Sequence, residues 1–217
     1  LYYTNFRLFK NNQFYSSISG NLYNKDASEL ILYAIGKKET SLIVPDGVTK
    51  IADFAFSGCR SITEITIPDS VISIGDSAFD YCINLAKINV GENNQSFTLI
   101  DGSLYNKEVT KLIKYDKYKT SLILPDTVTT ISNYACYESC LTKVTIPAQV
   151  TTIGERAFAY EAFSFRSRPS FESVKFEDNS SLLSIGAAAF AGCRKLESIF
   201  LPDSVNSIGE SAFEFCG

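Results

Sequence analysis

The sequence predicts an α/β solenoid: a right-handed stack of short coils with a parallel sheet on the concave side and short helical turns and β-hairpin insertions on the convex side. Three observations predict it: a repeated motif, an apolar pattern that changes period within each copy, and a longer duplicated block. The segments "IPDSVISIGDSAFDYC" (67–82) and "LPDSVNSIGESAFEFC" (201–216) share 11 of 16 residues. Internal repeats of 20 to 50 residues are typical of stacked-coil architectures.

The copies align on the position that follows each predicted strand, which is usually a proline. Successive spacings between these anchors range from 22 to 36 residues, and the shortest cluster near 23 residues. The base unit is therefore about 23 residues, lengthened by three insertions. The anchors are Phe9, Pro45, Pro68, Gly91, Pro125, Pro147, Glu177 and Pro202.

Each copy begins with a predicted short strand. Leu85, Ile88 and Val90 show the pattern, whose last members alternate with period two, as expected for a strand with one buried face. Proline ends the strand because it cannot donate to a sheet ladder. Eight such strands are expected to form one parallel sheet.

The second half of each copy predicts a bend and a helical turn. Gly75 suits a bend where φ is positive or where two backbones approach closely, and Gly154, Gly186 and Gly209 are its equivalents. Asp76 or Ser77 would cap the turn. The turn would bury Ala78, Phe79 and Cys82 on one apolar face.

One coil cannot shield its own apolar face, so the coils are expected to stack around a continuous core. Replacing the core residue Phe79 by Ala should cost about 3–5 kcal/mol.

A second repeat lies on top of the first. "LFKNNQFYSSISGNLYNK" (8–25) matches "VGENNQSFTLIDGSLYNK" (90–107) at an offset of 82 residues. Each block has two β-rich runs around a polar turn, which predicts hairpin insertions at about 14–39 and 97–119 in place of the convex turn. We expect residues 1–217 to form a single domain taken from a longer array.

Composition argues against several classes of function. The net charge is −4, which disfavours nucleic-acid binding. No run approaches 18 apolar residues, so we expect no segment to insert into a membrane. The chain has no His, which removes the commonest general base and metal ligand. The acidic residues after the anchors, such as Asp69 and Asp126, fit turns better than a catalytic pair. We therefore expect no enzyme activity, no metal and no cofactor.

The repeat "LxxIxIPxxVxxIGxxAFxxC" and the "GxLYNK…LI…P" insertion resemble the BspA-like leucine-rich repeat family from Tyr3 to Cys216. Ala52 and Ser132 depart from it at the glycine, and Cys136 departs at the phenylalanine. The resemblance implies a leucine-rich-repeat solenoid, secreted or displayed on the surface of host-associated bacteria or parasitic protists. It also implies adhesion to host proteins or to other cells, and it transfers no catalytic motif.

The candidate binding residues lie on the outward side of the predicted concave sheet, two or four positions before each anchor. Concave solenoid surfaces often bind partners. The candidates on this sheet are Arg7, Glu64, Thr66, Lys87, Asn89, Ile123, Lys143, Thr145, Lys175 and Phe200.

A second candidate is the insertion "YEAFSFRSRPSF" (160–171), which mixes aromatic and Arg residues as interface hot spots do. The alternative is a loop whose aromatic side chains pack on the neighbouring coil. Its candidate residues are Phe163, Phe165, Arg166 and Arg168.

Six cysteines invite a disulfide or metal reading, but four of them recur at one repeat position. Equivalent side chains in stacked coils point the same way about 4.8 Å apart, whereas bridged Cβ atoms lie about 3.5–4.5 Å apart. A column of buried thiols is the preferred interpretation. Asn94 and Asn179 fit the N-glycosylation pattern.

The first functional hypothesis is a non-catalytic adhesion module that binds a host extracellular-matrix or cell-surface protein, or a glycan. The alternative is a structural spacer without a ligand. The two differ in whether the concave sheet presents a contiguous apolar or charged patch.

Overall fold

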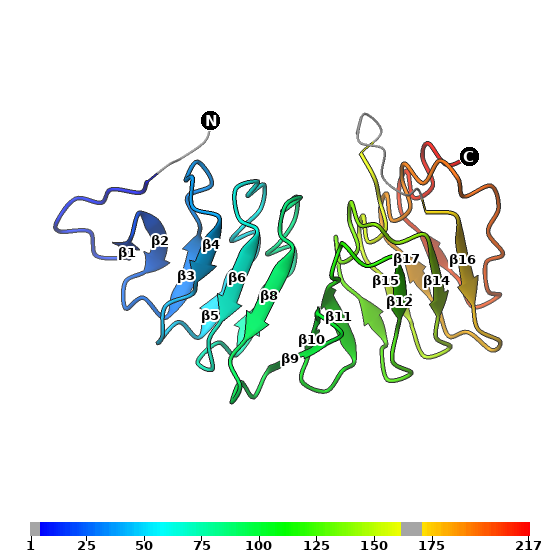
Figure 1. Ribbon diagram of the computed structural model, residues 1–217, viewed down its shortest axis with the longest axis horizontal. Helices are drawn as coiled ribbons and strands as arrows, with labels where there is room; N and C mark the ends of the chain where they lie inside the picture. The colour runs from blue at the N-terminus through cyan, green and yellow to red at the C-terminus, as the bar shows by residue number, and fades with distance from the viewer. Residues whose placement is uncertain (1–4, 162–170) are drawn as a thin grey trace. The chain divides into compact units, whose positions relative to one another are not determined.

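The computed structural model describes residues 5–161 and 171–217 and divides into two compact units, Leu1–Leu99 and Ile100–Gly217. Each unit is a β-solenoid. A three-stranded antiparallel meander comes first, and stacked parallel coils follow it (Figure 1). A typical coil places one strand in a first parallel sheet and a two-residue strand in a second sheet.

Unit 1 contains two sheets. The first is wholly parallel, with the order β4-β6-β8. The second has the order β1-β2-β3-β5-β7 and becomes parallel from β3 onward. The strands are β1 (Tyr15–Ile18), β2 (Asn21–Asn24), β3 (Glu29–Leu32), β4 (Ser41–Ile43), β5 (Lys50–Ile51), β6 (Glu64–Ile67), β7 (Ser73–Ile74) and β8 (Lys87–Val90).

Unit 2 repeats this plan. Its first sheet has the order β12-β14-β16, and its second has the order β18-β17-β15-β13-β11-β10-β9. The strands are β9 (Phe97–Ile100, of which only Ile100 lies within the bounds of unit 2), β10 (Ser103–Asn106), β11 (Lys111–Lys114), β12 (Ser121–Ile123), β13 (Thr130–Ile131), β14 (Lys143–Ile146), β15 (Thr152–Ile153), β16 (Ser173–Phe176), β17 (Ser184–Ile185) and β18 (Ser207–Ile208).

The segments expected to be hairpins contain three strands each and begin the second sheet, rather than replacing a turn between coils. The recurring "LYNK" motif explains the tight bend in each meander. In unit 2, Asn106 Oδ1 accepts hydrogen bonds from the backbone N–H groups of Thr110 (2.9 Å) and Lys111 (2.7 Å). Asn24 makes the equivalent bond to Glu29 N–H in unit 1.

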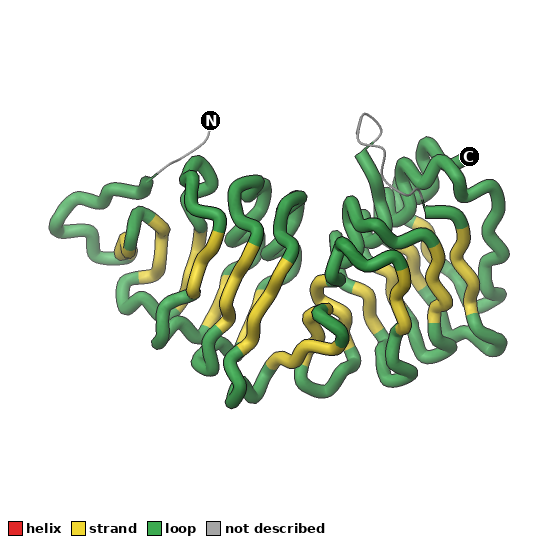
Figure 2. The backbone as a smooth tube through the Cα atoms, in the orientation of Figure 1, coloured by secondary structure: helices red, strands yellow, loops and turns green. Residues whose placement is uncertain are grey.

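The predicted helical turns are wrong. Residues 5–161 and 171–217 contain no helix, and the "AFxxC" segments are successive turns (Figure 2). Alternate N–H groups donate to the neighbouring coil, and those between them donate three positions back within the same coil, as Ala157 N–H does to Gly154 O. Phe158 N–H donates to Ala189 O and Phe190 N–H donates to Ala212 O, each at 2.8 Å. The fold class is therefore a β-solenoid rather than α/β, because hydrogen bonds between layers replace those within a helix.

Of the two roles predicted for the repeat glycine, the structure shows the close approach of two backbones. Gly186 does not have a positive φ, but a Cβ atom at this position would lie 2.6 Å from the carbonyl carbon of Gly154 in the preceding coil. Close approach of two backbones therefore requires glycine. The left-handed residue lies two positions later, at Ser77 (φ 59°) and Ala188 (φ 51°).

The exceptions at Ala52 and Ser132 follow from the same geometry. Their backbone N–H groups bond to Leu30 O and Leu112 O, both at 2.9 Å, in the last strand of each meander. Those strands, β3 and β11, continue straight past this point. A Cβ atom is tolerated because no bent coil lies against it.

The core of unit 2 lies between its two sheets and its turns. Ile131, Ile153 and Ile185 pair in register along β13, β15 and β17 and are at most 1% exposed. Phe158 and Phe190 stack behind them. Identical layers fit each other, which explains why the motif recurs.

Candidate binding surface

Alternation along the strands divides inward from outward side chains. Ile65 and Ile67 of β6 are fully buried, so Glu64 and Thr66 point outward. Parallel pairing then arranges the outward residues of each unit in two rows of three. We call the six residues in these two rows the strand face of the unit. The strand face of unit 1 is Ser41, Glu64, Lys87, Ile43, Thr66 and Asn89, and that of unit 2 is Ser121, Lys143, Ser173, Ile123, Thr145 and Lys175.

Four of the six residues on the strand face of unit 1 form a polar network, while Ile43 on the same face is 72% exposed. Lys87 Nζ lies 2.8 Å from Glu64 Oε1, and Asn89 Nδ2 donates to the same oxygen at 2.7 Å. Asn89 also donates to Thr66 Oγ1 at 3.3 Å. The hydrogen bonds from Lys87 and Asn89 lower the pKa of Glu64. This carboxylate is therefore charged and already has partners.

The strand face of unit 2 is open. Residues of β12, β14 and β16 line a depression of about 540 Å³, and Lys143 and Lys175 are among them. Ile123 is 89% exposed beside it. Neither lysine forms an ion pair with the described residues, and the undescribed residues contain no Asp or Glu.

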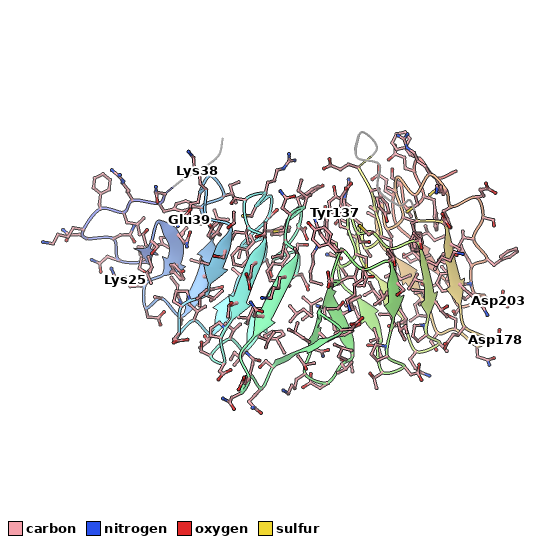
Figure 3. All side chains as sticks on the ribbon, in the orientation of Figure 1. Lys25, Lys38, Glu39, Tyr137, Asp178 and Asp203 are labelled. Carbon is pink, nitrogen blue, oxygen red and sulfur yellow. The ribbon has the colours of Figure 1, made fainter. Side chains whose placement is uncertain are left out.

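Acidic residues follow the strands at the anchor end of unit 2. Asp126 and Glu177 line the rim of the depression. Asp178 and Asp203, labelled in Figure 3, are exposed at the equivalent turns of later coils. Glu177 Oε2 accepts the backbone N–H of Ala148 at 3.1 Å, so it partly serves the turn. Basic side chains thus occupy the strands, and acidic side chains occupy the rim.

Two candidates from the sequence do not lie on these sheets. Arg7 is exposed in an irregular segment, because the N–H of neighbouring Phe6 donates to Gly20 O (2.7 Å) in the β1–β2 turn. Phe200 is 90% exposed, but residues 196–201 form no strand. The predicted sheet of eight strands is therefore two sheets of three.

The other eight sheet candidates divide between the two units. Glu64, Thr66, Lys87 and Asn89 meet on unit 1, and Ile123, Lys143, Thr145 and Lys175 meet on unit 2. The loop candidates Phe163, Phe165, Arg166 and Arg168 lie outside the described residues.

Sequence reasoning missed a hollow of about 470 Å³ over the turns of unit 2. Small residues, including Ala187, Ala188 and Gly192, line it, and Glu155 and Glu210 stand beside them. The signal was the run "AAAFAG" (187–192), which replaces larger residues of the neighbouring coils.

The cysteines are all free thiols, as the column interpretation predicts. Cys82 Sγ donates to Phe56 O at 3.1 Å, Cys193 Sγ to Phe158 O at 3.4 Å and Cys216 Sγ to Phe190 O at 3.3 Å. Burial raises the pKa values of the thiols of Cys193 and Cys216. These thiols are structural hydrogen-bond donors.

The acceptor asparagine is buried in one of the two glycosylation motifs and exposed in the other. Asn94 is 1% exposed, and its Nδ2 donates to Pro68 O (2.8 Å) and Val71 O (3.0 Å). Asn179 is exposed at a turn with φ 58°.

The part of the chain that the structure describes contains no group of three His, Cys, Asp or Glu side chains able to hold a metal ion. The same part contains no helix with the length and apolar character needed to cross a bilayer.

The repeat sequence matches the model of the BspA type leucine rich repeat region in six copies, over residues 35–164 and 160–217. The chain belongs to the BspA-type leucine-rich repeat family. No curated protein matches the chain.

Solved structures agree with this family. A leucine rich cell surface protein from Faecalibacterium prausnitzii A2-165 is 32% identical with a TM-score of 0.67, over 78% of this chain and 43% of that one. This chain thus spans less than half of that relative's length. The pneumococcal vaccine antigen PcpA is 18% identical with a TM-score of 0.60, over 94% of this chain and 69% of that one, and shares the fold.

Proposed function

We propose that this chain is a non-catalytic binding module of a secreted or cell-surface protein, and that it binds a protein partner on its strand faces. The partner class is a host extracellular-matrix or cell-surface protein. The observation that best supports the proposal is the strand face of unit 2. Its outward side chains stand on a hydrogen-bonded sheet, and they include two unpaired lysines and the exposed Ile123 beside a depression.

The physical argument concerns the cost of association. A partner that binds a rigid sheet orders few groups of the receptor, so less of the contact free energy is lost to conformational entropy. Ile123 is 89% exposed and would become buried, and the lysines would gain partners. The F. prausnitzii relative, 32% identical, is described as a cell surface protein, which supports the location.

The test compares two arginine substitutions in unit 2. Ile123→Arg changes the strand face, whereas Leu183→Arg changes a residue that is 46% exposed just before β17 of the second sheet. Each variant and the parent chain are immobilised, and the proteins retained from solubilised extracellular matrix are compared.

Loss of a retained protein with Ile123→Arg, but not with Leu183→Arg, supports the proposal. Retention of no protein by the parent chain, or equal retention by both variants, contradicts it and favours a structural spacer.

A further inference from the structure

The internal duplication presents two versions of one surface in a single chain. Register equates the two strand faces position by position, and half of the matched positions have the same residue in both units. The matched pairs are Ser41 and Ser121, Ile43 and Ile123, Thr66 and Thr145, Glu64 and Lys143, Lys87 and Ser173, and Asn89 and Lys175.

The positions that differ change the charge and the available partners. In unit 1, Glu64 accepts hydrogen bonds from Lys87 and Asn89, so a ligand competes with existing contacts for these groups. In unit 2, Lys143 stands in the place of Glu64. Ser173 and Lys175 stand in the places of its two partners, Lys87 and Asn89. The strand face of unit 2 consequently has two positive charges and no negative charge.

The two lysines are placed to bind one ligand together. Lys143 of β14 pairs with Ser173 of β16, and Lys175 lies two residues farther along β16 on the same face. For a strand spacing of about 4.8 Å and a rise of about 3.3 Å per residue, their Cα atoms lie about 8 Å apart. Their long side chains can reach a common anion.

Apolar surface adjoins the lysines. Ile123 of β12 pairs with Thr145, which pairs with Lys175, so these three residues form one row across the sheet. The depression of about 540 Å³ has room for more than one side chain of a ligand. Asp126 and Glu177 at the rim would repel an acidic segment that continued in that direction. The acidic group of a ligand is therefore confined to the strands.

We infer that the strand face of unit 2 binds an acidic polypeptide segment, with an Asp or Glu carboxylate between Lys143 and Lys175 and an apolar neighbour on Ile123. The inference rests on the proposed function, because it takes the strand face as the binding surface. The strand face of unit 1, whose charges are already paired, does not bind such a segment.

The first experiment titrates the full chain with a defined probe, the peptide acetyl-Gly-Glu-Leu-Glu-Leu-Gly-amide, and follows methyl and amide NMR shifts. Shifts should concentrate at Ile123, Thr145 and Lys175 and be absent at Ile43. The same peptide with Gln in place of Glu should bind about tenfold more weakly, and added salt should weaken the binding of the Glu peptide. Equal binding of the two peptides, or equal shifts on both units, would overturn the inference.

The second experiment exchanges the two faces. K143E together with K175N removes both lysines by installing two of the three differing unit 1 residues on unit 2, and it should reduce peptide affinity about tenfold. The converse variant of unit 1, E64K with K87S and N89K, should create a second peptide site of comparable affinity. All these side chains point outward, and unchanged circular dichroism and Tm verify folding. An unaltered peptide affinity in the first variant refutes the role of the lysines.

The outcomes also separate this inference from the proposed function. If Ile123→Arg abolishes retention of a protein partner while K143E with K175N does not, the strand face binds a partner without using carboxylates. The inference then fails and the proposed function stands. If neither change has any effect, both fail.

Discussion

The rings of Phe158 and Phe190 stack with their centroids 5.2 Å apart and their planes 8° from parallel. Phe213 continues the stack at 5.5 Å and 4° from Phe190. Three successive coils of unit 2 therefore hold a phenylalanine at the same position with its ring in the same orientation. Each ring covers the face of the next, so a layer is stabilised chiefly by its neighbours.

Phe190→Ala should destabilise unit 2 by about 3–5 kcal/mol, because it empties a site enclosed by rings on both sides. Urea unfolding followed by tyrosine fluorescence would measure the loss. Phe215→Ala is the matched control, since Phe215 is 57% exposed, and it should change stability by less than about 1 kcal/mol. Equal effects of the two substitutions would contradict the layered core.

Gly186→Ala should destabilise the fold by at least about 1–3 kcal/mol, because the added Cβ would lie 2.5 Å from Glu155 N and 2.6 Å from the carbonyl carbon of Gly154. Thermal unfolding of the variant would test this. Ser132→Ala tests the same repeat position where a side chain is tolerated. Among the described residues, Ser132 Oγ has no hydrogen-bond partner, so its removal should be neutral or slightly stabilising.

Asn94→Ala should destabilise the chain by about 2 kcal/mol or more, because it leaves buried backbone groups without partners. Asn94 Oδ1 accepts the N–H groups of Ser96 and Phe97, both at 2.8 Å, and its Nδ2 donates to two carbonyls. Chemical denaturation measures the loss.

The duplication supplies the control for Asn94. Asn12 makes the matching bonds to Phe14 N–H (2.9 Å) and Tyr15 N–H (2.8 Å), but in an exposed turn where water can replace them. Asn12→Ala should cost less than about 1 kcal/mol. A cost as large as that of Asn94→Ala would show that burial is not the cause.

Stability should fall as the pH rises above about 8.5, the pKa of a free thiol. Burial raises the pKa of the thiols of Cys136 and Cys193 and of the hydroxyls of Tyr105 and Tyr115. A raised pKa stabilises the fold while the group stays protonated in both states. That stabilisation is lost progressively once the unfolded chain ionises and the folded chain does not.

Unfolding free energies measured between pH 7 and pH 10.5 would test this dependence, and Cys193→Ala should flatten part of the slope. Titration with a thiol reagent gives a parallel measurement. All six thiols should react in denaturant, while Cys59, Cys136 and Cys193 should be protected in the native chain. Fewer than six reactive thiols after unfolding would contradict the free-thiol column.

The alternating apolar pattern correctly predicted six of the eight strands that precede the anchors, because a period of two with one buried side indicates a strand. It was wrong for the segments before Phe9 and Pro202. Within the six strands, it predicted that Glu64, Thr66, Lys143 and Thr145 point outward. The recurrence of Cys82, Cys193 and Cys216 at one position likewise predicted free thiols, because equivalent positions in stacked coils cannot face each other.

Tertiary structure decided what local sequence could not. "DSAFDYC" (76–82) is compatible with a helical turn, but it forms a series of turns because the preceding coil donates to its carbonyl groups, as Phe56 N–H does to Ala78 O. Glycine is required at position 186 and is not required at position 132, because a different backbone segment lies against each position. The contrast between the paired charges on the strand face of unit 1 and the unpaired lysines on that of unit 2 arises in the same way, since cross-strand register decides which charges meet. Register is a property of the stacked coils, and a single coil read alone does not contain it.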